Sequence, residues 1–382
     1  MIKLMFIFGT RPEAIKMAPI ILAANKSTHL FDVKVCVTGQ HKEMLNQMLD
    51  IFDIRPDYNL NLMTPNQTLP EISTRTILAV TDILKKDCPD WVLVQGDTTT
   101  VWAAAIAASF EKIRVGHIEA GLRSGDKNQP FPEETNRRIA SQIADLHFAP
   151  TYISERNLLN EGIHKDAIFV TGNTVVDSLH WVLEKNKKTP DQNVAAIQKW
   201  KKEHIGDKKF VLITGHRREN FGRGFENICK ALSVLAQKHK DICWVYPVHL
   251  NPNVQEPVNR TLGAFENVFL IEPQGYTAFA WLMNESMFIL TDSGGVQEEA
   301  PSLGKHVLVM RNTTERPEGV ELGIVKLVGT NPQGIIEHCE KLIADPEADS
   351  ITESPYGDGK SAMRILNAII DKQQHVSSYE ER

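Results

Sequence analysis

The hydrophobic residues of this sequence form short runs, and the segments between the runs carry apolar residues at helical spacing. Short apolar runs bounded by glycine, proline or polar residues predict buried strands, and the periodic segments between them predict helices. The strands predicted in the first half of the chain are residues 4–8, 33–38, 91–94, 113–118, 146–149 and 168–171. The helices predicted between them begin after Thr10 and near residues 39, 69, 98 and 133. A regular alternation of strand and helix indicates a parallel α/β sheet.

The same alternation restarts in the second half, after a charged segment at residues 185–208 that predicts a surface helix around a domain junction. The strands predicted there are residues 210–214, 242–246, 268–271, 287–290 and 307–310. A last helix is predicted at residues 360–372. The chain has 382 residues, which is enough for two or three domains. Two α/β domains of similar size, each with its own sheet, explain the pattern better than one long sheet.

Composition and charge exclude several classes of protein. The net charge of −6 gives no general attraction to nucleic acid or to anionic membranes, so any phosphate binding has to be local. The five cysteines are scattered without a CxxC pair, which is typical of reduced thiols in the cytoplasm. The apolar run at the N-terminus is too short for a signal peptide or a membrane span. We therefore expect a cytoplasmic protein without nucleic-acid or membrane partners.

Candidate chemistry gathers where the predicted strands end. Asp97 and Glu119 each follow a predicted strand, Glu133 begins a predicted helix, and Arg11 and Lys16 lie near the start of the first helix. Ligands of parallel α/β sheets bind beyond the carboxyl ends of the strands, where these residues fall. Carboxylates that lie close together acquire shifted pKa values, which suits proton transfer at a carbon atom. Taken singly, each acid is more often a solvated side chain or a helix cap, and only the three together favour a catalytic role.

The stretch TDSGGVQEEAPSLGK, residues 291–305, has the features of an anion-binding site. A predicted strand leads into Ser293, Gly294 and Gly295, which open a predicted helix. Free N–H groups at a helix N-terminus, together with the close approach that glycine allows, favour a phosphate there. Nearby carboxylates could bind the hydroxyl groups of such a ligand, and Arg316 its negative charge. The alternative is an ordinary strand–turn–helix unit in which the glycines serve only the turn.

Histidine, arginine and aromatic residues give less specific signals. His216 follows a predicted strand and could protonate or anchor a leaving phosphate, or it could be a structural histidine. Arg217 could bind a ligand, pair with the other domain or begin a helix in solvent. His117 ends a predicted strand, and both a structural and a site-lining role stay open for it. Aromatic residues such as Phe279 could fill the core, or one of them could stack on a uracil near Gln274.

Known cofactor and metal motifs are missing from the sequence. No predicted strand is followed by the GxGxxG fingerprint of nicotinamide-binding proteins, and Gly304-Lys305 lacks the rest of a Walker loop. HExxH and the Cys/His spacings of metal sites are also missing. The sequence therefore predicts a reaction that uses neither a cofactor nor a metal.

Taken together, these segments resemble the non-hydrolysing UDP-N-acetylglucosamine 2-epimerases. The matching stretches are FGTRPEAIKMAP (8–19), QGDTTT (95–100), GHIEAGLRS (116–124), PFPEETNRR (130–138), TGNTVVDS (171–178), TGHRREN (214–220), TDSGGVQEEAPSLGK (291–305) and TTERPEG (313–319). They run from the N-terminus past Gly319, so the resemblance covers most of the chain.

The resemblance implies the α/β fold of the GT-B glycosyltransferases, with two Rossmann-like parallel-sheet domains and a cleft between them. It implies an N-terminal domain at residues 1–172 with the catalytic acids, a UDP-binding domain at residues 173–359, and a C-terminal helix at residues 360–382 that packs back on the first domain. A homodimer is usual in the family.

The implied reaction is the reversible C2 epimerisation of UDP-N-acetylglucosamine (UDP-GlcNAc) to UDP-N-acetylmannosamine (UDP-ManNAc), for bacterial surface polysaccharide biosynthesis. A base removes the C2 proton while UDP leaves by anti-elimination, and UDP adds back to a 2-acetamidoglucal intermediate. The catalytic candidates that match the family motifs are Asp97, Glu119, Glu133 and His216. The substrate-binding candidates are Arg11, Lys16, Gln274, Phe279, Ser293, Gly294, Gly295, Glu299 and Arg316.

Within this set, the resemblance assigns Gln274 and Phe279 to the uridine, residues 293–295 to the diphosphate and Glu299 to the ribose. Which acid is the C2 base is left open. Some bacterial members also bind a second UDP-GlcNAc as an activator. The residues that could form such an allosteric site here are Gln40, His41, Arg217 and His249.

Three other functions compete with epimerisation. A retaining GT-B glycosyltransferase would share the diphosphate site, but the three acids of the first domain argue against it. A hydrolysing epimerase is usually fused to a kinase domain, for which 382 residues leave no room. A non-catalytic nucleotide-sugar sensor could lose the acids, and this chain retains them.

Overall fold

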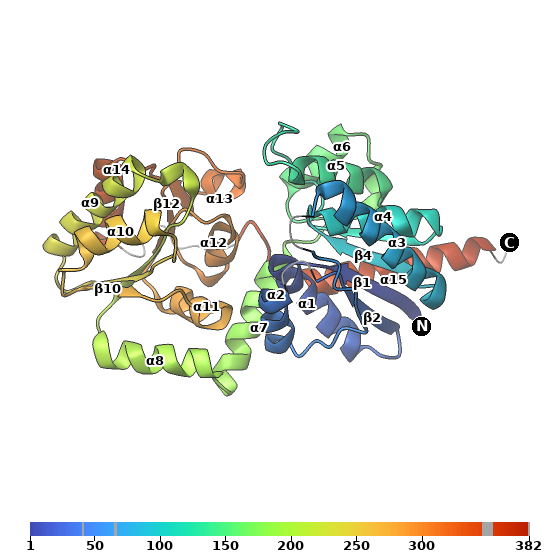
Figure 1. Cartoon of the computed structure of the whole chain (residues 1–382), viewed down its shortest axis with the longest axis horizontal. Coiled ribbons are helices and arrows are strands. Elements are labelled where there is room, and N and C mark those ends of the chain that lie inside the picture. Colours follow the sequence, from blue (N-terminus) through green and yellow to red (C-terminus); the bar gives the residue numbers. More distant parts are fainter. Residues whose placement is uncertain (40–41, 65–66, 346–353, 381–382) are drawn as a thin grey trace. The chain divides into compact units, whose positions relative to one another are not determined.

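The computed structural model describes the chain except for residues 40–41, 65–66, 346–353 and 381–382. Its contacts divide the chain into two compact units (Figure 1). Unit 1 consists of Met1–Ser178 and Gly357–Arg382, and unit 2 consists of Leu179–Tyr356. The first boundary falls within helix α7 (Thr174–Lys188), and the chain returns to unit 1 shortly before its last helix.

Unit 1 is built on a seven-stranded sheet in the order β3-β2-β1-β4-β5-β6-β7, in which all neighbours are parallel. Its strands are β1 (Ile2–Phe8), β2 (Phe31–Val37), β3 (Tyr58–Asn59), β4 (Trp91–Gln95), β5 (Arg114–Ile118), β6 (Leu146–Ala149) and β7 (Ile168–Val170). Six of these strands confirm the predicted apolar runs, and the two-residue strand β3 was not predicted. The strand order reverses beside β1, which makes the carboxyl ends of β1 and β4 the expected ligand edge of the sheet.

The helices of unit 1 form two layers around this sheet. They are α1 (Arg11–Lys26), α2 (Lys42–Ile51), α3 (Leu69–Asp87), α4 (Thr99–Phe110), α5 (Glu133–Ile143), α6 (Tyr152–Asn160) and α15 (Ser361–Glu380), with the first part of α7. Helix α4 packs between α3 and α5, whereas α1 packs against α2 and α15 (Figure 1). The alanine-rich sequence of α4 explains its close packing, because small side chains let neighbouring helices approach.

At the start of α1, hydrogen bonds to the side chain of Glu13 join segments that are distant in the sequence. Glu13 is buried, and its Oε2 accepts hydrogen bonds from the N–H groups of Gly9 at 3.0 Å and Thr10 at 2.7 Å. Its Oε1 accepts a third bond from Oγ1 of Thr98, at 2.8 Å, just before α4. Glu13 therefore fixes the β1–α1 turn to the start of α4. Burial raises the pKa of the Glu13 carboxyl, and these hydrogen bonds oppose that effect.

Unit 2 repeats the same architecture with a six-stranded parallel sheet in the order β10-β9-β8-β11-β12-β13. Its strands are β8 (Phe210–Thr214), β9 (Cys243–Pro247), β10 (Val268–Ile271), β11 (Ile289–Thr291), β12 (Val307–Val309) and β13 (Val325–Leu327). Five of them confirm the predicted strands, and β13 was not predicted. The order reverses beside β8, so the carboxyl ends of β8 and β11 form the corresponding ligand edge.

The helices of unit 2 also pack in two groups. They are α8 (Gln192–His204), α9 (Arg223–Lys238), α10 (Pro252–Leu262), α11 (Tyr276–Glu285), α12 (Gly294–Glu299), α13 (Pro317–Glu321) and α14 (Pro332–Ala344), together with the end of α7. Helix α9 packs against α10 and α14, and α11 packs against α8 (Figure 1). Large side chains such as Trp244, Tyr246 and Phe225 are fully buried in the core under α9.

The last helix, α15, is anchored to unit 1 at its first turn. The N–H of Ala362 donates a hydrogen bond of 2.9 Å to Oδ1 of Asp177, which lies in α7. Helix α15 continues to Glu380, beyond the predicted end at residue 372. No helix in the described part of the chain is long and apolar enough to cross a membrane.

The turn after β5 requires glycine at position 121, and this requirement can be tested. Gly121 has a φ of +90°, and a Cβ on it would stand 2.2 Å from the carbonyl oxygen of Ser154 in α6. Gly162 has a similar φ of +84°, but a Cβ there would meet no atom within 4 Å. We expect Gly162→Ala to cost about 1–2 kcal/mol for the left-handed backbone alone. Gly121→Ala should cost a further ~1–3 kcal/mol through overpacking against α6.

Urea unfolding followed by circular dichroism measures both variants against the parent chain. Equal midpoints for Gly121→Ala and Gly162→Ala would show that α6 does not press against this turn.

Candidate active site

Glu119 lies directly after β5, at the carboxyl edge of the unit 1 sheet. It has a φ of +61°, a strained conformation for a residue other than glycine, and its side chain is only 7% exposed. Its Oε1 accepts hydrogen bonds from Nζ of Lys16 and, at 3.0 Å, from Nδ2 of Asn173. Its Oε2 accepts a bond from Nε2 of Gln95. The structure therefore brings the predicted residues Glu119 and Lys16 together as an ion pair.

Asp97 lies next to this group, one residue after Gly96. A Cβ placed on Gly96 would stand 3.7 Å from Oε2 of Glu119, so the ends of β4 and β5 are close. The Asp97 carboxylate pairs with the Nη2 group of Arg137 in α5. The other terminal nitrogen of Arg137, Nη1, lies 3.1 Å from the fully buried carboxylate of Glu134. One guanidinium thus bridges two acids and fixes the first turn of α5 to the end of β4.

The third predicted acid, Glu133, is the first residue of α5. Its Oε2 is buried and has no hydrogen-bond partner among the described residues. Glu133 immediately precedes Glu134, so it lies on the same turn that Arg137 ties to Asp97. A buried carboxylate oxygen that receives no hydrogen bond from the described protein is available to accept one from a ligand.

His117 is completely buried on β5. Its Nε2 lies 2.7 Å from the carbonyl oxygen of Gly96. Burial lowers its pKa to about 4, so the ring is neutral at neutral pH. Of the two roles that the sequence left open, the structure excludes direct lining of a solvent-accessible site.

In unit 2, the buried carboxylate of Asp292 organises the loop after β8. Its Oδ2 accepts hydrogen bonds from the N–H groups of His216 at 2.9 Å and Arg217 at 2.8 Å, and from Nδ2 of Asn220 at 3.2 Å. Asp292 directly follows β11, the neighbour of β8 in the sheet. A buried carboxylate needs such donors, so it forces the His216–Arg217 turn to fold over the end of β11.

Two guanidinium groups flank Gly294, the first residue of α12. A Cβ on Gly294 would stand 2.9 Å from Nη1 of Arg316 and 3.4 Å from Nη2 of Arg217. A Cβ on the next residue, Gly295, would meet no atom within 4 Å. Ser293 is the N-cap residue, and its side chain makes no capping hydrogen bond. The structure therefore places the predicted residues of this stretch beside two positive charges, an arrangement that fits a diphosphate.

The position of Arg316 depends on a row of alternating charges. Its Nε donates a bond of 2.6 Å to the buried Glu298, and its Nη1 lies 3.7 Å from Glu315. Arg311 donates two further bonds to Glu315, at 3.0 and 3.1 Å. Burial by itself would raise the pKa of Glu315, but the hydrogen bonds from Arg311 and from the backbone outweigh it and lower the pKa to about 2. Arg316 is thus held between the carboxylates of Glu298 and Glu315.

The imidazole rings of His216 and His249 stack, with their centroids 5.7 Å apart and their planes 22° apart. Nδ1 of His216 lies 3.6 Å from Oδ1 of Asp292. Burial lowers the pKa of His216, although Asp292 opposes the shift. The structure therefore brings together two predicted residues, His216 and His249, that the sequence had placed in different roles.

The residues predicted to meet a uridine lie around the start of α11. Gln274 precedes the helix, and its Nε2 donates a bond of 2.7 Å to the carbonyl of Glu272. Phe279 is half-buried within the helix. Tyr276 donates a hydrogen bond of 3.4 Å from its hydroxyl to Oε1 of Glu299 in α12. Through this contact, the start of α11 is joined to the helix that Gly294 opens.

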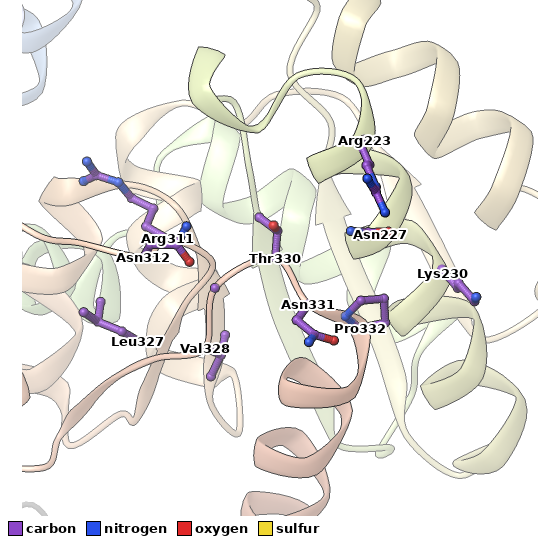
Figure 2. Close-up of a pocket in the computed structure, with 11 residues that line it drawn as sticks. Arg223, Asn227, Lys230, Arg311, Asn312, Leu327, Val328, Thr330, Asn331 and Pro332 are labelled. Atoms are coloured by element: carbon purple, nitrogen blue, oxygen red, sulfur yellow. The ribbon is translucent and has the colours of Figure 1, made fainter.

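Unit 2 also carries a groove of about 680 Å³ beside the N-terminal parts of α9 and α14 (Figure 2). Arg223, Asn227 and Lys230 line it from one face of α9, and Thr330 and Asn331 line it from the segment before α14 (Figure 2). None of the predicted site residues lines this groove. Within the described part of the chain, no group of His, Cys, Asp and Glu could hold a metal ion.

Comparison with known proteins identifies the family to which these features belong. The family model described as UDP-N-acetylglucosamine 2-epimerase matches residues 23–370.

The chain belongs to the UDP-N-acetylglucosamine 2-epimerase family.

The UDP-N-acetylglucosamine 2-epimerase of Escherichia coli K12 is 53% identical over 377 residues, covering 96% of this chain and 98% of the relative. The crystal structure of UDP-GlcNAc 2-epimerase from Neisseria meningitidis bound to UDP-GlcNAc is 50% identical, with a TM-score of 0.84 over 97% of this chain and 100% of that one. The enzyme from Methanocaldococcus jannaschii in complex with UDP-GlcNAc and UDP is 36% identical, with a TM-score of 0.77 over 97% of this chain and 99% of that one.

Membership of this epimerase family confirms the resemblance drawn from the sequence motifs. It also confirms the fold class, because these family structures have the GT-B arrangement of two parallel-sheet α/β domains. Epimerases of this kind are isomerases. Of the remaining predicted residues, Arg11 is the first residue of α1, at the carboxyl end of β1. Gln40 and His41 lie outside the described residues.

Sequence reasoning missed three residues that hold the predicted family site in place. Asp292 lies in the TDSGG stretch, and its position directly after a strand is the signal that could have identified it. Arg137 and Asn173 also lie in motifs shared with the family, yet nothing in their spacing indicates that they bind Asp97 and Glu119. Their partners are distant in sequence, so the contacts emerge only in the folded chain.

Replacing Asp292 by asparagine tests its organising role. The asparagine side chain has the same shape as aspartate, but an NH2 group replaces one of the two accepting oxygens. This NH2 donor would face the backbone N–H groups, which are donors too, so hydrogen bonds would be lost. We expect Asp292→Asn to lower the free energy of unfolding by about 1–3 kcal/mol. Asp207→Asn, at an exposed position in the same unit, is the matched control and should unfold as the parent does. The midpoint of urea unfolding measures the stability of both variants. Equal midpoints for Asp292→Asn and Asp207→Asn would contradict the organising role of Asp292.

Proposed function

We propose that this chain interconverts UDP-GlcNAc and UDP-ManNAc by eliminating UDP and adding it back, with the product serving bacterial surface polysaccharide biosynthesis. Membership of the epimerase family supports the substrate, because the Neisseria relative is bound to UDP-GlcNAc and the Methanocaldococcus relative to UDP-GlcNAc and UDP. The observation that carries the reaction type is the acid cluster of unit 1. A retaining glycosyltransferase or a nucleotide-sugar sensor has no need of it.

The chemistry explains why several acids are required. One carboxylate accepts the C2 proton, the electrons of the C2–H bond form the C1=C2 double bond, and the C1–O bond breaks as UDP leaves with its electron pair. The product of this step is 2-acetamidoglucal. A C2–H bond without an adjacent carbonyl is weakly acidic, so the base has to act together with strong stabilisation of the leaving diphosphate. Re-addition of UDP, with a proton delivered to the opposite face of C2, completes the inversion.

In this proposal the acids of unit 1 exchange the C2 proton. Asp97 and Glu119 are each fixed by a cationic side chain, Arg137 and Lys16, which supports their precise placement. Glu133 has a buried oxygen without a partner in the described chain, which supports a direct meeting with the sugar. Inverting C2 requires proton transfer on two faces, so more than one of these acids takes part.

The groups of unit 2 would bind the UDP portion. Arg316 and Arg217 stand beside Gly294 and supply two positive charges for the diphosphate, together with Ser293 and Gly295. We assign Glu299 to the ribose, and Gln274 and Phe279 to the uracil. His216 would donate a hydrogen bond from its imidazole to the leaving phosphate, and burial lowers the pKa of this ring. His249 stacks on this ring and would orient it.

One incubation separates the proposal from its rivals. We expect the protein, given UDP-GlcNAc in deuterated water, to form UDP-ManNAc and to place deuterium at C2 of both sugars, as measured by proton NMR. Free ManNAc would indicate a hydrolysing epimerase instead. An unlabelled and unchanged sugar would leave a transferase or a sensor, and it would also remove the basis for a role in supplying UDP-ManNAc.

Amide variants test the acid cluster. We expect Asp97→Asn, Glu119→Gln and Glu133→Gln to lower kcat by about 10²–10⁴-fold wherever the acid transfers a proton. The control is Asp166→Asn, whose parent side chain is 78% exposed and which should keep the parental rate. If all three amide variants interconvert the sugars at the parental rate, the acid mechanism is wrong.

A further inference from the structure

Among the described residues, the polar contact of the His117 side chain is with the turn that carries Asp97. On neighbouring strands β4 and β5, Val94 pairs with His117, so the imidazole lies beside the last residues of β4. Its Nε2 lies 2.7 Å from the carbonyl oxygen of Gly96. A carbonyl oxygen can only accept a hydrogen bond, so Nε2 carries the proton and donates. The other ring nitrogen, Nδ1, is buried without a hydrogen-bond partner among the described residues.

This hydrogen bond completes a clamp on the backbone of Asp97. Gly96 has a φ of +80°, and its N–H donates a bond of 3.0 Å to the carbonyl of Ile118 on β5. Its carbonyl oxygen accepts the hydrogen bond from Nε2–H of His117, which fixes the peptide group before Asp97. The carbonyl of Asp97 accepts a bond of 2.8 Å from Nδ2 of Asn136 in α5, which fixes the peptide group after it. Both peptide groups flanking Asp97 are therefore fixed by buried side chains.

The clamp matters because glycine alone does not hold a turn in one conformation. Without the His117 bond, the peptide group between Gly96 and Asp97 could rotate, since glycine allows a wider range of backbone dihedral angles than other residues. A rotation there would move the carboxylate of Asp97 relative to Glu119, whose Oε2 lies 3.7 Å from the Cβ position of Gly96. Catalytic groups tolerate little displacement, and a shift of about 1 Å can lower the rate by ~10²-fold.

We infer that His117 is a positioning residue for the epimerisation proposed above, acting through its Nε2–H···O=C bond to Gly96 to set the place of the Asp97 carboxylate. The inference rests on the proposed function, because it assumes that Asp97 takes part in the reaction. It predicts that His117 affects turnover and leaves the binding of UDP, whose assigned groups are in unit 2, unchanged.

Two amide substitutions test this geometry as a matched pair. The amide nitrogen of glutamine can occupy the position of Nε2 in histidine, whereas that of asparagine occupies the position of Nδ1. His117→Gln can therefore donate to Gly96, and His117→Asn cannot. We expect kcat within about 3-fold of the parent for His117→Gln and about 10–100-fold lower for His117→Asn, with KM and the Kd for UDP within ~3-fold in both variants.

A double-mutant cycle separates positioning from a general loss of structure. If His117 acts through Asp97, adding His117→Asn to Asp97→Asn should lower kcat no further, because the group being positioned is already absent. His117→Met is a second variant without a donor, and it avoids burying an unpaired amide if His117→Asn folds poorly. It should show the same loss of kcat. Circular dichroism checks the fold of every variant.

The outcomes keep this inference distinct from the proposed function. A parent protein that forms no UDP-ManNAc overturns the proposed function itself. An active parent with equal kcat for His117→Gln and His117→Asn overturns the inference alone, whether both are parental or both are impaired. Additive losses in the Asp97→Asn background would also overturn it.

Discussion

A carboxylate that is removed from water has to be met by hydrogen-bond donors, and this requirement shapes the ligand edges of both sheets. In unit 1, the Glu13 carboxylate accepts hydrogen bonds from the N–H groups of Gly9 and Thr10 and from the hydroxyl of Thr98. In unit 2, the Asp292 carboxylate accepts hydrogen bonds from the N–H groups of His216 and Arg217. Each acid ties a loop after one strand to the end of the neighbouring strand. The loops that carry the candidate chemistry are therefore fixed by acids that are themselves out of reach of a ligand.

A second group of acids is paired with cations at the two edges. Lys16 joins Glu119, Arg137 joins Asp97 to Glu134, and Arg316 lies between Glu298 and Glu315. Pairs of this kind place charged groups accurately, because each guanidinium or ammonium group restricts the rotamers of the acid that it contacts. A chain with a net charge of −6 can still offer positive charge to a diphosphate, because the guanidinium groups of Arg217 and Arg316 both lie beside Gly294.

The hydrophobic pattern was sufficient for most of the fold because buried parallel strands are continuous apolar runs. The two strands that escaped prediction, β3 and β13, are short edge strands, which need less apolar sequence. The candidate acids were found because they follow strands. Their partners were not, because the contacts that matter join residues far apart, such as the 76 positions between His216 and Asp292. Spacing in sequence carries no information about such contacts.

The backbone of Glu119 has a consequence for how this sequence can change over time. A φ of +61° is unstrained for glycine and only slightly strained for asparagine. For glutamate this conformation costs roughly 1 kcal/mol or more. Selection for thermal stability alone would favour glycine at this position. Glycine would, however, remove the carboxylate that pairs with Lys16 and accepts hydrogen bonds from Gln95 and Asn173, so a relaxed backbone and these polar contacts are in direct conflict at a single residue.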